Sequence, residues 1–170
     1  NPGFEEGKEG WRPDHSTTNF ITVTHPYPVH SGDWAASLNR TDWVADEIYI
    51  YQDVEGIIGG MPYALSGWAT CNSNFRWVKL RIDWRNASGS VGWWVDSDVL
   101  TGDEEEYQLL TIPKQGGGES VRAPHDATIA HIECMACIQE PNPDTPVFFD
   151  DLSFTFQGSK VFVPLVVKNY

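Results

Sequence analysis

The sequence predicts an all-β protein, folded as a sandwich or a barrel. Two observations lead to this prediction. Gly (15 residues) and Pro (11 residues) recur between short runs rich in Val, Ile, Thr, Trp and Tyr, a rhythm typical of short strands joined by turns. No segment of comparable length keeps a helical period of apolar residues. The chain has 170 residues, 13% of them aromatic, so it is long enough to bury one hydrophobic core.

Eight runs satisfy the strand pattern. The first two, NFITVTH and WAASLN, are short and β-branched or apolar, and EIYIYQDV and YALSGWATC alternate apolar with polar residues. FRWVKLRIDWRN is the longest run, EYQLLTI and DATIAHIECMACI follow polar turns, and VFFDDLSFTFQ closes the series. The expected strands therefore cover residues 19–25, 34–39, 47–54, 63–71, 75–86, 106–112, 126–138 and 147–157.

We expect one β-sandwich domain over residues 1–157 and a C-terminal tail over residues 158–170. The tail contains the apolar run VFVPLVV and is either an added edge strand or a linker. We favour the edge strand, because an exposed run of this kind would associate with other strands.

Strand parity separates the core from a second face, because successive side chains point to opposite sides of a sheet. One set is expected in the core: Val78, Leu80, Ile82 and Trp84, with Ala130, Ile132, Cys134 and Ala136. The other set is expected on a solvated face that takes part in binding: Trp77, Lys79, Arg81 and Asp83, with His131, Glu133, Met135 and Cys137.

This mixture of side chains suits a sugar. A pyranose ring has an apolar C–H face that can rest on an aromatic ring, and its hydroxyl groups pair with carboxylates, guanidinium and imidazole. The adjacent pair Trp93 and Trp94 adds to the set, because two neighbours in an extended segment cannot both face the core. Packing in the core or at its rim remains the alternative for any single Trp.

The charge distribution limits the partners. Eleven Lys and Arg against 24 Asp and Glu give a net charge of −13, which repels nucleic acid and anionic membranes. No run approaches the roughly 18 apolar residues of a membrane span. Because the chain starts at Asn1 rather than Met, we expect a processed product or an excised module of a larger secreted or cell-surface protein.

Cysteine chemistry and catalytic motifs give little support for an enzyme. Cys71, Cys134 and Cys137 are either buried thiols or include one disulfide from Cys71 to one of the others. The sequence has no G-x-S-x-G, H-E-x-x-H, P-loop or EF-hand pattern. We therefore expect no catalytic step; a jelly-roll glycoside hydrolase or polysaccharide lyase, and a protein-binding or adhesion domain, remain alternatives.

Five segments occur in an order that resembles carbohydrate-binding modules of the family 4/9 and 22 kind. They are NPGFEEG followed by Trp11, then PVHSGDWAASL, IYQDV, PYALSGWATC and VFFDDLSF, and together they extend from Asn1 to about Gln157. The resemblance implies a jelly-roll, galactose-binding-like sandwich of two antiparallel sheets. It also implies a non-catalytic role in binding a polysaccharide or oligosaccharide, and a structural calcium ion.

A calcium site is expected where oxygen ligands of distant segments meet, since Ca²⁺ takes six to eight hard oxygen ligands. Glu5 follows the first turn, Asp150 begins the DD pair of the last strand, and HSGD is an oxygen-rich turn. The resemblance implies as ligands the Gly3 carbonyl, Glu5, a group near Ser31, the Trp34 carbonyl and Asp150. The alternative is that Glu5 and Asp150 are surface acids.

The resemblance also implies which side chains contact the glycan. It places one aromatic at Trp43 and another at Trp93 or Trp94, with an imidazole contact at His131. Together with the parity argument, the candidate ligand-binding residues are Trp43, Trp77, Arg81, Trp93, Trp94, His131 and Glu133.

Overall fold

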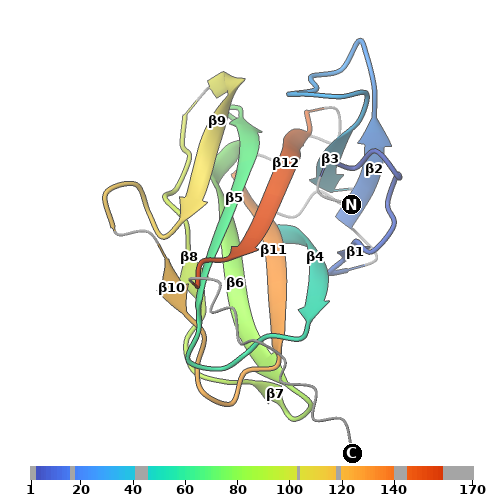
Figure 1. The fold of residues 1–170 in the computed structure, drawn as a ribbon. Coiled ribbons are helices and arrows are strands. Elements are labelled where there is room, and N and C mark those ends of the chain that lie inside the picture. The colour runs from blue at the N-terminus through green and yellow to red at the C-terminus, as the bar shows by residue number, and fades with distance from the viewer. Residues whose placement is uncertain are drawn as a thin grey trace, which may run out of the picture.

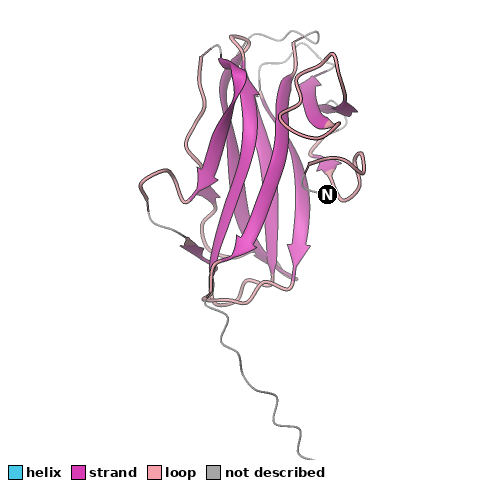
Figure 2. Ribbon diagram, turned by 45° about the horizontal axis from the view of Figure 1, so that its top comes forward, coloured by secondary structure: helices cyan, strands magenta, loops and turns pink. Residues whose placement is uncertain are grey.

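The computed structural model describes residues 3–15, 18–40, 46–102, 104–117, 120–139 and 145–158. The described residues form strands, turns and loops and contain no helix (Figure 2). Accordingly, no helix that could cross a membrane is found among them. The tail from residue 159 onward, for which we predicted an edge strand, lies outside the described residues.

Two antiparallel sheets pack face to face (Figure 1). Sheet A has the order β1-β4-β11-β6-β7, with β8 also paired to β6. Its strands are β1 (Arg12–Pro13), β4 (Glu47–Glu55), β6 (Phe75–Asn86), β7 (Gly89–Ser90), β8 (Val95–Asp96) and β11 (Ile129–Ile138).

Sheet B has the order β10-β5-β12-β3-β2, with β9 also paired to β5. Its strands are β2 (Thr18–Val23), β3 (Ala35–Arg40), β5 (Pro62–Cys71), β9 (Glu104–Ile112), β10 (Val121–Arg122) and β12 (Val147–Phe156). This architecture confirms the predicted two-sheet antiparallel β-sandwich of the jelly-roll class. All eight predicted strands are present, and the four that we did not predict have only two residues each.

The core lies between the inward faces of the two sheets and follows the predicted parity. Sheet A contributes Val78, Leu80, Ile82 and Trp84 from β6, and Ala130, Ile132, Cys134 and Ala136 from β11, all of them buried. Sheet B contributes Leu38, Leu65, Leu110 and Phe149 to the same cluster. From Trp77 to Arg85 and from Ile129 to Cys137 the side chains alternate, so the odd-numbered ones point to the outer face of sheet A. Phe75, beyond the register shift, packs in the core.

Candidate functional site

The outward side chains of sheet A form rows across β4, β11 and β6. His131 lies between Asp53 and Asp83, and Glu133 lies between Tyr51 and Arg81. The next two rows are Tyr49, Met135 and Lys79, and then Glu47, Cys137 and Trp77. We call these outward residues of β4, β11, β6 and β8 the polar face. The structure therefore brings Trp77, Arg81, His131 and Glu133 together on one sheet face, as the parity argument predicted.

One expectation about this face is wrong. We expected a solvated surface, but His131, Glu133, Met135 and Cys137 are all buried, with only 2% of His131 and 5% of Glu133 exposed. The reason is that β11 is the central strand of sheet A. Long side chains on the flanking β4 and β6 cover the β11 side chains from both sides, so β11 forms a floor.

The cations on the polar face are paired with carboxylates. Arg81 donates from Nε to Asp96 Oδ1 at 2.6 Å and from Nη2 to Asp96 Oδ2 at 3.1 Å, and Lys79 Nζ donates to the same carboxylate at 2.9 Å. Burial disfavours ionisation of Asp96, but the hydrogen bonds from Arg81 and Lys79 outweigh burial and lower its pKa. One row away, Arg85 Nε donates to Asp83 Oδ2 at 2.7 Å.

The floor of the polar face holds a chain of titratable groups. Nδ1 of His131 lies 2.6 Å from Asp53 Oδ1, and Nε2 lies 3.6 Å from Glu133 Oε1. Burial lowers the pKa of His131, although the hydrogen bond to Asp53 opposes this. Burial raises the pKa of Glu133 to about 7. These directions follow from the loss of water around each charged form.

Aromatic rings border the paired charges. Trp94 has 53% of its surface exposed, and the guanidinium carbon of Arg81 lies 4.7 Å from its ring centroid. Trp77 packs in the same way under Lys79 Nζ, at 4.4 Å. Trp93 is 84% exposed. The remaining predicted aromatic, Trp43, lies outside the described residues.

Several residues of the polar face were missed by the sequence reasoning. Tyr49, Tyr51 and Asp53 lie on the same side of β4, and the Tyr51 ring lies 4.4 Å from the His131 ring. Asp96 on β8 was also missed. The alternation in EIYIYQDV was a usable signal for the β4 residues, because Ile48 and Ile50 are buried in the core. A two-residue strand such as β8 carries no comparable pattern.

A hollow of about 300 Å³ adjoins the polar face at the edge formed by β1 and β4. Tyr51 and Asp53 belong both to the polar face and to this hollow, and Arg12 of β1 also lines it. The register places Arg12 opposite Tyr51. The polar face therefore continues to the edge of sheet A, with a further cation there.

The predicted metal ligands gather at a second place, where the N-terminal turn, the loop before β3 and β12 meet. Glu5 accepts hydrogen bonds from the backbone N–H groups of Asp33 and Trp34, at 3.1 to 3.2 Å. Asp150 Oδ2 accepts from the N–H groups of His30 and Ser31, at 2.9 and 3.2 Å.

Gly3 lies beside these acids, since a Cβ added there would be 3.7 Å from Glu5 Cγ and 3.9 Å from Asp150 Oδ1. Asp150 is fully buried, and burial raises its pKa. Across the described ranges, no group of three or more His, Cys, Asp or Glu side chains is arranged to hold a metal ion. A cation here would therefore depend on backbone carbonyls for several of its ligands.

An irregularity in β12 brings a third carboxylate to this place. The pairing of β12 with β5 shifts between Asp150 and Ser153, and Asp151 has a positive φ of 48°. Regular alternation would send Asp150 and Asp151 to opposite faces. Instead, Asp151 accepts from Ser31 Oγ at 2.9 Å and contacts His30 Nδ1 at 2.6 Å. Sequence reasoning did not single out Asp151 or His30.

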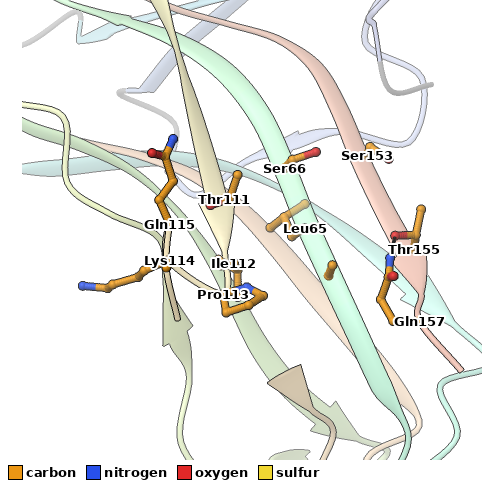
Figure 3. A pocket seen from close by; sticks show the side chains of 12 residues that line it. Leu65, Ser66, Thr111, Ile112, Pro113, Lys114, Gln115, Ser153, Thr155 and Gln157 are labelled. Atoms are coloured by element: carbon orange, nitrogen blue, oxygen red, sulfur yellow. Dashed lines mark hydrogen bonds between the residues drawn. The ribbon is translucent and has the colours of Figure 1, made fainter. Parts of the chain in front are cut away.

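Other cavities in the described part of the sandwich lie away from the polar face, and the two larger ones are on the side of sheet B. A trough of about 330 Å³ on sheet B is lined by Ser66, Thr111 and Ser153, with Lys114 and Gln115 on one side and Thr155 and Gln157 on the other (Figure 3). A cavity of about 530 Å³ lies between Tyr27, Phe148 and Asn74. The three cysteines are buried thiols that form no disulfide, so the alternative of a disulfide from Cys71 is wrong.

Comparison with known proteins supports the fold. No protein-family model matches the chain, and no curated protein matches it in sequence. Among solved structures, the chain resembles the enzymatically active domain of tailspike protein 4 from bacteriophage CBA120, with a TM-score of 0.68 and 12% identity over 92% of this chain. The chain spans only 21% of that tailspike chain.

Two further similar structures come from xylanase 10B of Clostridium thermocellum. One is a family 22 carbohydrate-binding module joined to a family 10 hydrolase module, complexed with xylohexaose, with a TM-score of 0.67 and 16% identity over 95% of this chain and 28% of that one. The other is the C-terminal family 22 carbohydrate-binding module, with a TM-score of 0.66 and 14% identity over 92% of this chain and 91% of that one. The chain therefore has the jelly-roll β-sandwich fold that is also seen in these family 22 carbohydrate-binding modules.

Proposed function

We propose that this protein is a non-catalytic module of a secreted or cell-surface protein, and that it binds a polysaccharide chain on the polar face of sheet A. The observation that carries the proposal is the arrangement of Trp94 over Arg81, next to rows of paired charges. A half-exposed indole offers a flat apolar surface, and the charged rows offer hydrogen-bond donors and acceptors. A sugar ring needs both.

The pairing of the charges supports an uncharged ligand. Arg81 and Lys79 share Asp96, and Arg85 bonds to Asp83, so these charges largely cancel within the polar face. The same bonds hold the side chains in place before a ligand arrives, which reduces the entropy lost on binding. Trp94 is held in the same way by the cation–π contact with Arg81.

Xylan is the first polysaccharide to test. Solved structures with the same fold include a family 22 module complexed with xylohexaose and a xylan-binding domain. Because their identity to this chain is only 16% and 14%, their ligand is a starting point for a panel rather than a conclusion. The panel includes neutral β-linked and α-linked polysaccharides in affinity electrophoresis.

The test is Trp94→Ala, with Tyr27→Ala as the matched control. The two side chains are equally exposed, at 53% and 54%, but Tyr27 packs on Phe148 of sheet B, away from the polar face. Loss of a stacking indole is expected to weaken binding about tenfold or more, by analogy with the 1–3 kcal/mol of a base stacked on an aromatic ring. Trp93→Ala tests the neighbouring indole. Retention of Trp94→Ala equal to that of the control would refute the proposal.

A structural calcium ion belongs to the same proposal. The carboxylates of Glu5 and Asp150 and the carbonyls of Gly3 and Trp34 would hold it, with Ser31 beside them. These are hard oxygen donors, and the buried Asp150 accepts hydrogen bonds only from backbone N–H groups in the described part of the chain. When bound, Ca²⁺ supplies the positive charge that offsets burial of this carboxylate.

Glycoside hydrolysis is a second candidate, favoured by one observation. Glu133 has a pKa raised to about 7, and a raised carboxyl pKa is typical of the general acid of glycosidases. Purified protein that hydrolyses a glycan, with the activity abolished in Glu133→Gln, would establish this candidate. The deep position of Glu133 on the floor of the sheet favours the binding role instead.

A further inference from the structure

Glu133 is a buried carboxyl group to which no cation is committed. In the described part of the chain no hydrogen bond reaches Glu133, and its one ion-pair contact is with His131 Nε2, at 3.6 Å. Arg81 lies directly opposite Glu133 on β6, but its guanidinium group bonds to Asp96. Lys79, in the next row of β6, bonds to the same carboxylate. The charge of Glu133 is therefore compensated only by groups that already have partners.

The other charged and titratable groups around Glu133 are nearly balanced. Acids lie in the next row on both sides of it, because Asp53 on β4 and Asp83 on β6 are both opposite His131. Arg85 is bonded to Asp83 and so cancels part of that charge. The full set facing Glu133 is Tyr49, Tyr51 and Asp53 on β4, Lys79, Arg81, Asp83 and Arg85 on β6, Asp96 on β8, His131 on β11, and Arg12 on β1 beyond Tyr51.

Glu133 and His131 form a pair of titratable groups in close contact. An ionised carboxylate only accepts hydrogen bonds, so Nδ1 of His131 carries the hydrogen of its 2.6 Å contact with Asp53. Nε2 then lies 3.6 Å from Glu133 Oε1, beyond hydrogen-bond distance, so a proton bound by this pair resides on either the imidazole or the carboxyl group. Burial raises the pKa of Glu133 and lowers that of His131, which favours the carboxyl group near neutral pH.

We propose that glycan binding on the polar face displaces a proton from the Glu133–His131 pair, so that affinity for the glycan rises with pH. This inference rests on the proposed function. A carboxylate accepts a hydroxyl hydrogen bond more strongly than a neutral carboxyl group does, because the bond is charge-assisted. The competing cost is desolvation, but the fold itself has already removed 95% of the exposed surface of Glu133 before any ligand arrives. The ligand therefore gains the stronger bond at little further cost.

The sign and size of the effect follow from linkage. If the ligand prefers the deprotonated pair, affinity is lower when Glu133 is protonated and increases as the pH rises through about 7. A charge-assisted hydrogen bond is about twice as strong as a neutral one, which corresponds to about a fivefold rise in affinity between pH 6 and pH 8.

The experiment is isothermal titration calorimetry with xylohexaose, or with a hexasaccharide of whichever polysaccharide the panel selects, from pH 5.5 to pH 8.5. Titrations at pH 7 in buffers of different ionisation enthalpy measure the number of protons released. We expect release of a fraction of one proton and an affinity that increases with pH. Glu133→Gln is expected to lose both effects, whereas Asp126→Asn, a change of an exposed acid in the turn before β11 and outside the polar face, should keep them.

The outcomes separate the two proposals. An absence of binding at every pH, to every polysaccharide of the panel, contradicts the proposed function. Binding that is independent of pH, or that weakens as the pH rises, overturns the proton displacement alone. Proton release that persists unchanged in Glu133→Gln also overturns it, because the proton would then come from another group. If Glu133→Gln does not bind the glycan, the number of protons released by the unmodified protein, measured from its buffer-dependent binding enthalpy, still tests the proton displacement.

Discussion

At the scale of single residues, neighbouring acids on one sheet face have opposite properties. Asp96 accepts hydrogen bonds from Arg81 and Lys79, and these bonds lower its pKa despite burial. Glu133 is on the strand next to the same two cations, accepts a hydrogen bond from neither, and has a pKa raised by burial to about 7. The difference arises because the guanidinium and ammonium groups turn toward β8 rather than β11. Glu133 is thus a charge that the fold tolerates poorly.

This leads to a prediction for stability. Because the pKa of Glu133 is higher in the folded protein than the ordinary value of 4.5, the folded state binds the proton more tightly, and stability falls as the pH rises from about 4.5 to 7. Glu133→Gln removes that loss. The free energy of unfolding of the variant minus that of the unmodified protein should therefore be larger at pH 8 than at pH 5, by on the order of 2 kcal/mol. Denaturant unfolding at both pH values measures this, and equal differences at pH 5 and pH 8 would contradict it.

At the scale of elements, the edge beside β6 determines where Trp94 and Asp96 lie. Residues 95–100 run along β6, with Val95 opposite Ile82, Asp96 opposite Arg81 and a bridge between Val78 and Leu100. Between these pairs, the Ser97 side chain takes the place of a backbone carbonyl as hydrogen-bond acceptor. The hydroxyl of Ser97, which is fully buried, accepts from the Leu80 N–H at 2.9 Å and donates to the Asp98 carbonyl at 2.7 Å.

Ser97→Ala is therefore expected to destabilise the protein more than an ordinary surface change. The substitution leaves the buried N–H of Leu80 without its acceptor, and an unsatisfied buried donor costs about 1–3 kcal/mol. The matched control is Ser73→Ala, since Ser73 is an exposed turn residue. Thermal unfolding compares the two variants. A melting temperature for Ser97→Ala equal to that of Ser73→Ala would show that water or the backbone replaces the hydroxyl at no cost.

The strands and their faces could be predicted from the sequence because they depend on alternation, a local property. Val78, Leu80, Ile82 and Trp84 are buried as expected, and Trp77 and Arg81 are on the opposite face. What alternation cannot predict is which strand becomes central. The burial of His131 and Glu133 follows from pairing with residues of β4 and β6 that lie at least 48 positions away in the sequence, the nearest being Asp83 opposite His131.

At the scale of the whole molecule, three distant segments meet at the candidate metal site. Glu5 binds the backbone of the loop before β3, and Asp150 and Asp151 of β12 bind residues of the same loop. The positive φ of Asp151 and the shifted register of β12 bring both carboxylates to this loop. No sequence pattern predicts such a bulge, because a DD pair in a regular strand would divide between the two faces. The loop is thereby attached to the N-terminal turn and to the sandwich.

The cluster predicts a response to metal removal. If Ca²⁺ joins Glu5 and Asp150, binding linkage adds about 2.7 kcal/mol at a concentration one hundred times the dissociation constant. Chelation should then lower the melting temperature by about 5 °C or more. Asp150→Asn should abolish the response to added Ca²⁺, because the amide removes a charged ligand. Asp126→Asn, a change in a turn far from the cluster in sequence, serves as the charge-matched control.

The same variants separate the metal from the hydrogen bonds that the carboxylates already make. Asp150 accepts the backbone N–H groups of His30, Ser31 and Asp151, so Asp150→Asn destabilises the protein even if no ion binds. A chelator acts only on an ion. A melting temperature that does not change with chelator or with added Ca²⁺, together with a destabilised Asp150→Asn, would mean that the acids join the three segments through hydrogen bonds alone.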